Sequence, residues 1–154
     1  MKKYRAVVFD FDDTIYDWKN LDRGLTHAEW MHQCMTGNVQ YENAEKGRIN
    51  PQICEVIKEC LDAGVPVYVC TVVYTSYETK EKELFLIKNV DERLEGRVIG
   101  VRNPMLKVDF LEMLQMEYGG ERKEYLLVDD WIDTVEQCLD AGFFAITPPN
   151  IFVA

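Results

Sequence analysis

The chain has 154 residues, 17 of them basic and 27 acidic, so its net charge is 17 − 27 = −10 at neutral pH. This length fits a single domain over residues 1–154, large enough to bury about two-thirds of its unfolded surface. The negative charge disfavours a nucleic-acid polymer as partner, because phosphate backbones repel an acidic surface. No apolar run approaches the ~20 residues of a membrane span, and we expect neither a membrane segment nor a signal peptide.

Cysteine usage indicates a reducing compartment. The 5 cysteines form neither a Cys-x-x-Cys pair nor a His/Cys cluster with zinc spacing. Their odd number, and the place of Cys70 in an apolar run, predict reduced thiols and a cytoplasmic location.

The first predicted element is a buried strand that ends in carboxylates. Residues 7–9 are Val-Val-Phe, as in a strand covered on both faces, and Asp10, Asp12, Asp13 and Thr14 follow. Carboxylates this close repel one another unless a cation or a proton compensates, and Mg²⁺ is the hard cation that suits oxygen ligands. The alternative is a solvated turn, in which Asp is common.

Helices and strands then alternate to the end of the chain. Asn50 as N-cap and Pro51 as first residue begin a helix that ends at Ala63-Gly64. Later helices are predicted over 77–88, 107–118 and 134–141, and the remaining strands over 67–71, 97–101, 125–128 and 143–146.

This alternation predicts an α/β, Rossmann-like three-layer sandwich, with a mostly parallel five-stranded sheet and helices on both faces. Ligands bind such sheets outside the carboxyl ends of the strands. The polar residues fall at these ends: Asp10 and Asp12, then Thr71, then Asp129 and Asp130. Three strands therefore direct polar side chains into one crevice.

With these residues in place, the chain resembles the haloacid dehalogenase superfamily of phosphohydrolases. Residues 9–14, Phe-Asp-Phe-Asp-Asp-Thr, are similar to its DxDxT signature. Thr71 matches the second motif, a lone Thr or Ser, and Lys107 matches the third, a lone Lys. Asp129 with Asp133 matches the fourth motif, a DxxxD or DD arrangement.

The resemblance implies a Mg²⁺-dependent phosphatase that acts on a small phosphorylated substrate. Asp10 would be the nucleophile that forms an aspartyl-phosphate, and Asp12 the general acid/base. Mg²⁺ would bind the Asp10 side chain, the Asp12 backbone carbonyl and Asp129. Thr71 would donate a hydrogen bond to a phosphoryl oxygen, and Lys107 would hold nucleophile and phosphate together.

Several acids keep alternative roles at this point. Asp130 competes with Asp129 as the metal ligand, and Asp133 lies near the metal or caps the helix predicted from Thr134. Asp13 occupies a position that often holds Gly in the family, and we expect it to be solvated or to lie just behind the site.

The roles of Thr71 and Lys107 have alternatives too. The alternative for Thr71 is a strand-end residue that serves only the local backbone. The alternative for Lys107 is a solvated helix residue. Lys80, Lys82 and Arg102 are rival cations, but Lys80 and Lys82 lie in a run of alternating charge that is typical of an exposed helix face.

Residues 17–48 form a candidate small, cap-like insert, too short for a core of its own. Such a minimal cap leaves the crevice open, either to bulky phosphorylated substrates or to a second subunit of a homo-oligomer.

Other functions fit the same motifs. A 5′-nucleotidase is one, because the segment 71–88 is similar to that of small deoxyribonucleotidases. A phosphotransferase and a non-catalytic binding protein are others, although the complete set of acids argues against the last. Asp12 favours phosphoryl transfer over carbon–halogen cleavage, because dehalogenases of the family lack an acid there.

Overall fold

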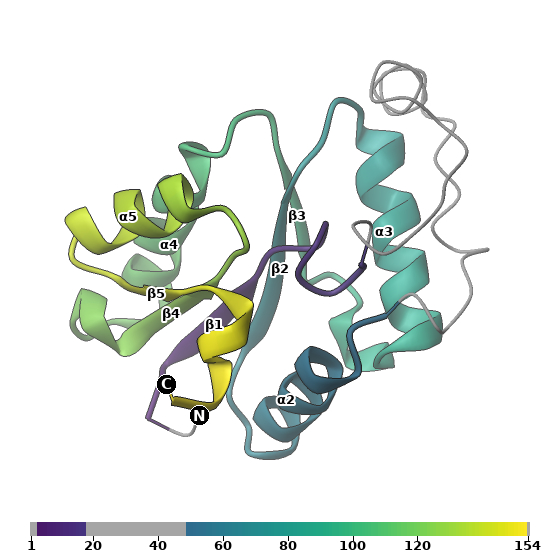
Figure 1. Ribbon diagram of the computed structural model, residues 1–154, viewed down its shortest axis with the longest axis horizontal. Coiled ribbons are helices and arrows are strands. Elements are labelled where there is room, and N and C mark those ends of the chain that lie inside the picture. The colour runs from purple at the N-terminus through teal and green to yellow at the C-terminus, as the bar shows by residue number, and fades with distance from the viewer. Residues whose placement is uncertain (1–2, 18–48, 154) are drawn as a thin grey trace.

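A computed structural model describes residues 3–17 and 49–153 of the chain. These residues contain a five-stranded sheet in the order β3-β2-β1-β4-β5, in which every neighbouring pair is parallel (Figure 1). The predicted α/β, Rossmann-like fold is therefore confirmed, and the described sheet is fully rather than mostly parallel.

The elements lie close to their predicted positions. The largest difference is in the last helix, which begins at Ile132 instead of Thr134. The strands are β1 (Ala6–Phe9), β2 (Val67–Val72), β3 (Val98–Val101), β4 (Tyr125–Val128) and β5 (Phe144–Ile146). The α-helices are α2 (Pro51–Asp62), α3 (Ser76–Asn89), α4 (Leu106–Tyr118) and α5 (Ile132–Asp140), and the short 3-10 helices are η3 (Glu92–Leu94), η4 (Arg122–Glu124) and η5 (Pro148–Val153).

Two hydrophobic cores lie on the two faces of the sheet. Successive residues of a strand point to opposite faces, so Val7 and Phe9 pack with α2 and α3, whereas Ala6 and Val8 pack with α4 and α5. Figure 1 shows these helix pairs on either side of the sheet. This arrangement gives the three layers that the alternation of strands and helices predicts.

The capping prediction for α2 is confirmed. The Asn50 side chain accepts hydrogen bonds from the backbone N–H groups of Gln52 at 3.1 Å and Ile53 at 3.4 Å. Pro51 takes the first helical position, where its missing N–H costs no hydrogen bond.

The direction of the chain through the sheet reverses at β1. From β1 the chain moves outward to β2 and β3, and it then returns to the other side of β1 for β4 and β5. A crevice forms at such a reversal, at the carboxyl ends of the two diverging strands. Asp10 follows β1 directly and Asp129 follows β4 directly, so both lie at this crevice.

Some predictions fall outside or near the limits of the described residues. The cap-like insert 17–48 lies outside them apart from Asp17, and so does Cys34. Within the described ranges, no helix combines the length and the apolar content that a bilayer crossing needs. The described cysteines, at positions 54, 60, 70 and 138, are free thiols.

Candidate active site

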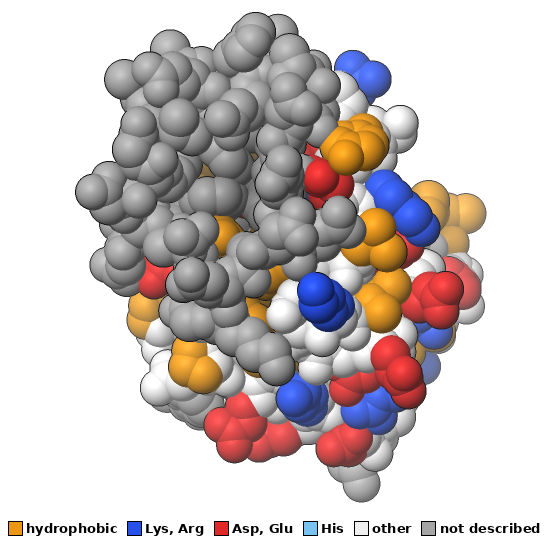
Figure 2. Space-filling view, turned by 90° about the vertical axis from the view of Figure 1, so that its right-hand side faces the viewer, with side chains coloured by type: hydrophobic (Ala, Val, Ile, Leu, Met, Phe, Trp, Pro, Cys, Tyr) orange, Lys and Arg blue, Asp and Glu red, His pale blue; other side chains and the backbone are white. Residues whose placement is uncertain are grey.

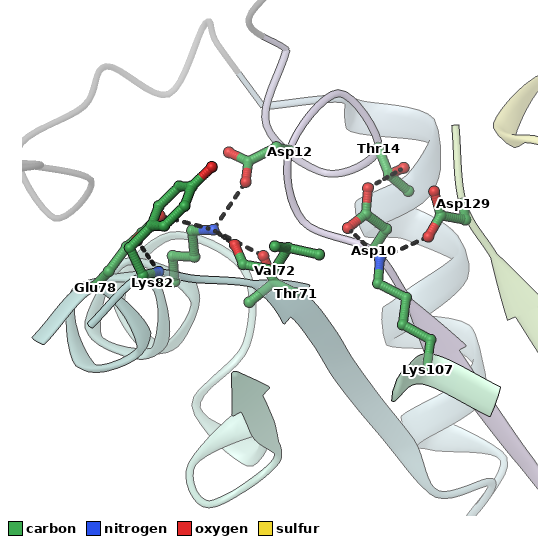
Figure 3. Close-up of polar contacts among 10 residues, drawn as sticks. Asp10, Asp12, Thr14, Thr71, Val72, Glu78, Lys82, Lys107 and Asp129 are labelled. Carbon is green, nitrogen blue, oxygen red and sulfur yellow. Dashed lines mark hydrogen bonds and ion pairs between the residues drawn. The ribbon is translucent and has the colours of Figure 1, made fainter. Parts of the chain in front are cut away.

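A lysine joins the acids that follow β1 and β4. Lys107 Nζ, from the first turn of α4, donates to Asp10 Oδ1 at 2.8 Å and to Asp129 Oδ2 at 2.6 Å (Figure 3). Thr14 Oγ1 donates to Asp10 Oδ2 at 3.5 Å, and the Trp131 backbone N–H donates to Asp129 Oδ1 at 2.9 Å. The two acids are 7% and 1% exposed and Lys107 is 3% exposed, so its alternative role as a solvated helix residue is wrong.

Burial and charge pairing shift the pKa values of Asp10, Asp129 and Lys107. It raises the pKa of Asp10 well above its usual range, and the Lys107 ammonium opposes that shift. It also raises the pKa of Asp129, again against Lys107. Burial alone would lower the pKa of Lys107, but the two carboxylates outweigh it and the pKa is raised. Two acids share one cation here, so a second positive charge would stabilise the ionised carboxylates.

The acids offer a suitable donor set for a hard cation. Asp10, Asp129 and Asp130, here called the acid cluster, each present a carboxylate oxygen, and these oxygens lie within 4.8 Å of one another. Oxygens on opposite sides of a Mg²⁺ ion lie about 4.2 Å apart, so small side-chain movements would bring this set to the required distances. Asp129 and Asp130 each present an oxygen to this set, and the choice between them as metal ligand stays a prediction.

A second buried lysine lies beside Asp12. Lys82 Nζ, from α3, donates to Asp12 Oδ2 at 2.8 Å, to Thr71 Oγ1 at 2.7 Å and to the Val72 carbonyl at 3.4 Å. It also forms an ion pair with Glu78 Oε1 at 3.5 Å (Figure 3). Thr71 is fully buried in β2, and its hydroxyl therefore serves this side-chain group rather than the local backbone alone.

The prediction that Lys82 lies on an exposed helix face is wrong. Its side chain is 0% exposed, whereas that of Lys80 is 65% exposed. Figure 2 shows the face on the right-hand side of Figure 1, where basic and acidic side chains are intermixed. Lys82, however, shares the inner face of α3 with Glu78, Phe85 and Leu86, which are also buried. Their spacing of three and four residues was the signal that could have identified it.

Asp13 and Asp133 lie apart from the acid cluster. Asp13 has a φ of 60°, and its N–H donates to the Tyr16 carbonyl at 2.7 Å, so it shapes the turn after β1. Asp133 is exposed in the first turn of α5. The N-cap of α5 is Trp131, so the prediction that Asp133 caps this helix is wrong.

No protein-family model and no curated protein matches the sequence. The chain does match solved structures. One is a putative haloacid dehalogenase-like hydrolase from Burkholderia xenovorans, with a TM-score of 0.63 and 14% identity over 92% of this chain and 80% of that one. Another is CbbY from Rhodobacter sphaeroides in complex with phosphate, with a TM-score of 0.60 and 12% identity over 94% and 85% of the two chains.

A third match is D,D-heptose 1,7-bisphosphate phosphatase from Burkholderia thailandensis. Its TM-score is 0.53, and its identity is 16% over 90% of this chain and 74% of that one. The chain thus has the fold of haloacid dehalogenase-like hydrolases, and the resemblance that the motifs indicated is confirmed for the fold.

Proposed function

We propose that the protein is a Mg²⁺-dependent phosphoric monoester hydrolase that acts through an aspartyl-phosphate on Asp10. One observation carries this proposal: Asp10 lies at the reversal point of the sheet, bonded to Lys107 and grouped with Asp129 and Asp130. A carboxylate normally repels a phosphate dianion, but a lysine and a divalent cation at the same place would neutralise the combined charge.

In the first half-reaction, a carboxylate oxygen of Asp10 forms a bond to phosphorus while the bond from phosphorus to the leaving oxygen breaks. Asp12 begins as the neutral acid and gives its proton to the leaving oxygen, so that a free alcohol departs. The chain is left with an aspartyl-phosphate on Asp10 and a carboxylate on Asp12.

In the second half-reaction, the Asp12 carboxylate removes a proton from a water molecule as that water attacks phosphorus. The bond between phosphorus and Asp10 breaks, and inorganic phosphate departs. Asp10 is again a carboxylate and Asp12 is again an acid, so the cycle is closed.

Other residues hold the phosphoryl group in place. The acid cluster and the Asp12 backbone carbonyl would hold Mg²⁺, which when bound draws negative charge from the phosphoryl oxygens. Lys107 would keep the Asp10 carboxylate beside the phosphate. The Thr71 hydroxyl would donate to a phosphoryl oxygen.

We expect the substrate to be a small phosphorylated metabolite. One of the matching structures is named as a bisphosphate phosphatase and another holds phosphate, which supports this substrate class. The free thiols favour a reducing compartment such as the cytoplasm.

The test is a screen of phosphorylated metabolites, together with p-nitrophenyl phosphate, in which released phosphate is measured with Mg²⁺ or with a chelator. We expect hydrolysis only with Mg²⁺, and a loss of at least about 10⁴-fold in kcat for Asp10→Asn. Asp140→Asn makes the same chemical change at an exposed position of α5 and should keep full activity. Full activity of Asp10→Asn would contradict the proposal.

A further inference from the structure

The ammonium of Lys82 is buried at the edge of the sheet where we place the chemistry. Its side chain is 0% exposed, and those of its ion-pair partners Glu78 and Asp12 are 2% and 33% exposed. Removing an ammonium from water costs several kcal/mol, and an apolar residue of similar volume commonly replaces a buried ion pair without loss of stability. Packing of α3 alone therefore gives no reason for a lysine here.

The contacts of Lys82 join parts of the chain that are distant in sequence. It binds Asp12, in the turn after β1 and 70 residues away, and Thr71 of β2, 11 residues away. An ammonium can only donate, so both side chains present an oxygen acceptor to it. The Asp12 carboxyl is thereby fixed relative to β2. Figure 3 shows it directed toward Lys82, while Asp10 is directed toward Lys107.

The same contact sets the direction of the Thr71 hydroxyl. Thr71 Oγ1 accepts a hydrogen bond from Lys82 Nζ, so its own O–H points away from the ammonium. The Thr71 hydroxyl hydrogen therefore remains available to donate to a phosphoryl oxygen.

Glu78 gives Lys82 a second counter-ion. Its Oε1 lies 3.5 Å from Lys82 Nζ, and its Oε2 accepts the Tyr74 backbone N–H at 3.1 Å, which fixes the carboxylate at the start of α3. When Asp12 gains or loses its proton, Lys82 keeps a negative partner. The ionised Glu78 carboxylate thus compensates the buried ammonium while Asp12 carries a proton.

We propose that Lys82, held by Glu78, is a positioning residue that orients the Asp12 carboxyl for proton transfer to the leaving group. The proposal rests on the proposed phosphohydrolase function and adds to it a residue outside the four motifs of the resemblance.

The experiment compares kcat/KM for two aryl phosphates of similar size, p-nitrophenyl phosphate and p-methylphenyl phosphate. The first has a leaving group that departs without a proton, whereas the second needs the general acid. For Lys82→Met we expect kcat/KM to fall less than about 10-fold with the nitrophenyl ester and at least about 100-fold with the methylphenyl ester, the size of general acid–base effects. Lys80→Met, on the exposed face of α3, should change neither value.

Two further variants separate positioning from folding. Lys82→Met with Glu78→Gln removes both buried charges, and its thermal unfolding shows whether the fold persists; it should keep the selective loss with the methylphenyl ester. In an Asp12→Asn background, Lys82→Met should cause no additional selective loss, because it acts through Asp12.

Equal losses with both esters, no loss with either, or a double variant that does not fold would each overturn the role of Lys82. A failure of the proposed function gives a different result: wild-type protein that hydrolyses neither ester, or an active Asp10→Asn variant.

Discussion

Two buried lysines reach the same edge of the sheet from opposite faces, and they differ in the acids that they hold. Lys107 belongs to α4 and binds Asp10 and the acid that follows β4. Lys82 belongs to α3 and binds Asp12 and Glu78. Asp10 and Asp12 are separated by one residue, yet each has its own cation.

This separation suits two carboxylates with different tasks. A nucleophile must stay ionised, whereas a general acid must carry a proton at one stage and lose it at the next. Like charges close together force one acid to keep its proton, and a shared cation would couple the two titrations. Separate lysines allow the two acids to be controlled independently.

Removing Lys107 should give the largest effect on stability. In Lys107→Met, Asp10 and Asp129 are left buried without their cation, and we expect the free energy of unfolding without metal to fall by about 3–5 kcal/mol. Mg²⁺ should restore most of it, because both acids are proposed ligands. Urea denaturation with chelator or Mg²⁺ measures this, and Lys123→Met, at a 77% exposed side chain, should stay within about 0.5 kcal/mol of wild type. Failure of Mg²⁺ to stabilise Lys107→Met would contradict the assignment of the ligands.

Removing Lys82 should cost somewhat less, about 3 kcal/mol, because a third of the Asp12 side chain remains in water. Here Mg²⁺ should add only the stabilisation that it gives wild-type protein, since neither the Asp12 side chain nor Glu78 is a proposed ligand. Adding Glu78→Gln should recover at least about 1 kcal/mol by removing the buried charge that was left alone. The same denaturation series tests both points, and equal rescue of the two lysine variants by Mg²⁺ would remove the distinction between them.

A smaller loss of stability is expected from Gly100→Ala, which acts on the packing of α3. A Cβ added at Gly100 would lie 2.2 Å from Thr79 Oγ1 and 2.6 Å from Val73 Cγ2, so Gly100→Ala should displace α3 from β3 at a cost of about 1–3 kcal/mol. Because α3 carries Lys82, the rate with p-methylphenyl phosphate should fall more than the rate with p-nitrophenyl phosphate. Stabilisation by Mg²⁺, measured as a rise in Tm, should be unchanged. A lost Mg²⁺ effect would show that the two lysine groups are not independent.

A last effect is a dependence of stability on pH that belongs to Asp10. Burial raises the pKa of Asp10 in the folded chain, so the folded state binds this proton more tightly than the unfolded state. Wild-type protein without metal should therefore lose stability relative to Asp10→Asn as the pH rises from the usual carboxyl pKa near ~4 through the raised value. Urea denaturation of both proteins across this pH range measures the difference. A difference that is constant with pH would contradict the raised pKa.

The main features of the site could be predicted because they depend on local patterns. Apolar runs that end in acid mark the carboxyl ends of β1 and β4, and parallel strands bring such ends to one edge. This reasoning located Asp10 and Asp129 without knowledge of the strand order. The resemblance to a known family supplied Lys107.

Lys82 was missed for a physical reason. Its charge pattern, read along the chain, is that of a solvated helix, and its main partners come from other elements, Asp12 at a separation of 70 residues. The only sign of its burial was its spacing to Phe85 and Leu86, which puts the three residues on one face of the helix. A charged residue on a buried helix face is rare unless it is paired. The start of α5 was misplaced because no side-chain cap marks it.

The position of β1 at the centre of the sheet has a consequence for how the protein folds. Asp10 is synthesised early, but 97 residues separate it from Lys107, and β4 lies further along the chain. Until those segments emerge from the ribosome, Asp10 must remain hydrated and ionised. Its pairing with Lys107 depends on a contact between distant parts of the chain, and such contacts form slowly because their loop-closure entropy is high. A chain that stops short of α4 therefore carries Asp10 without the lysine that pairs with it.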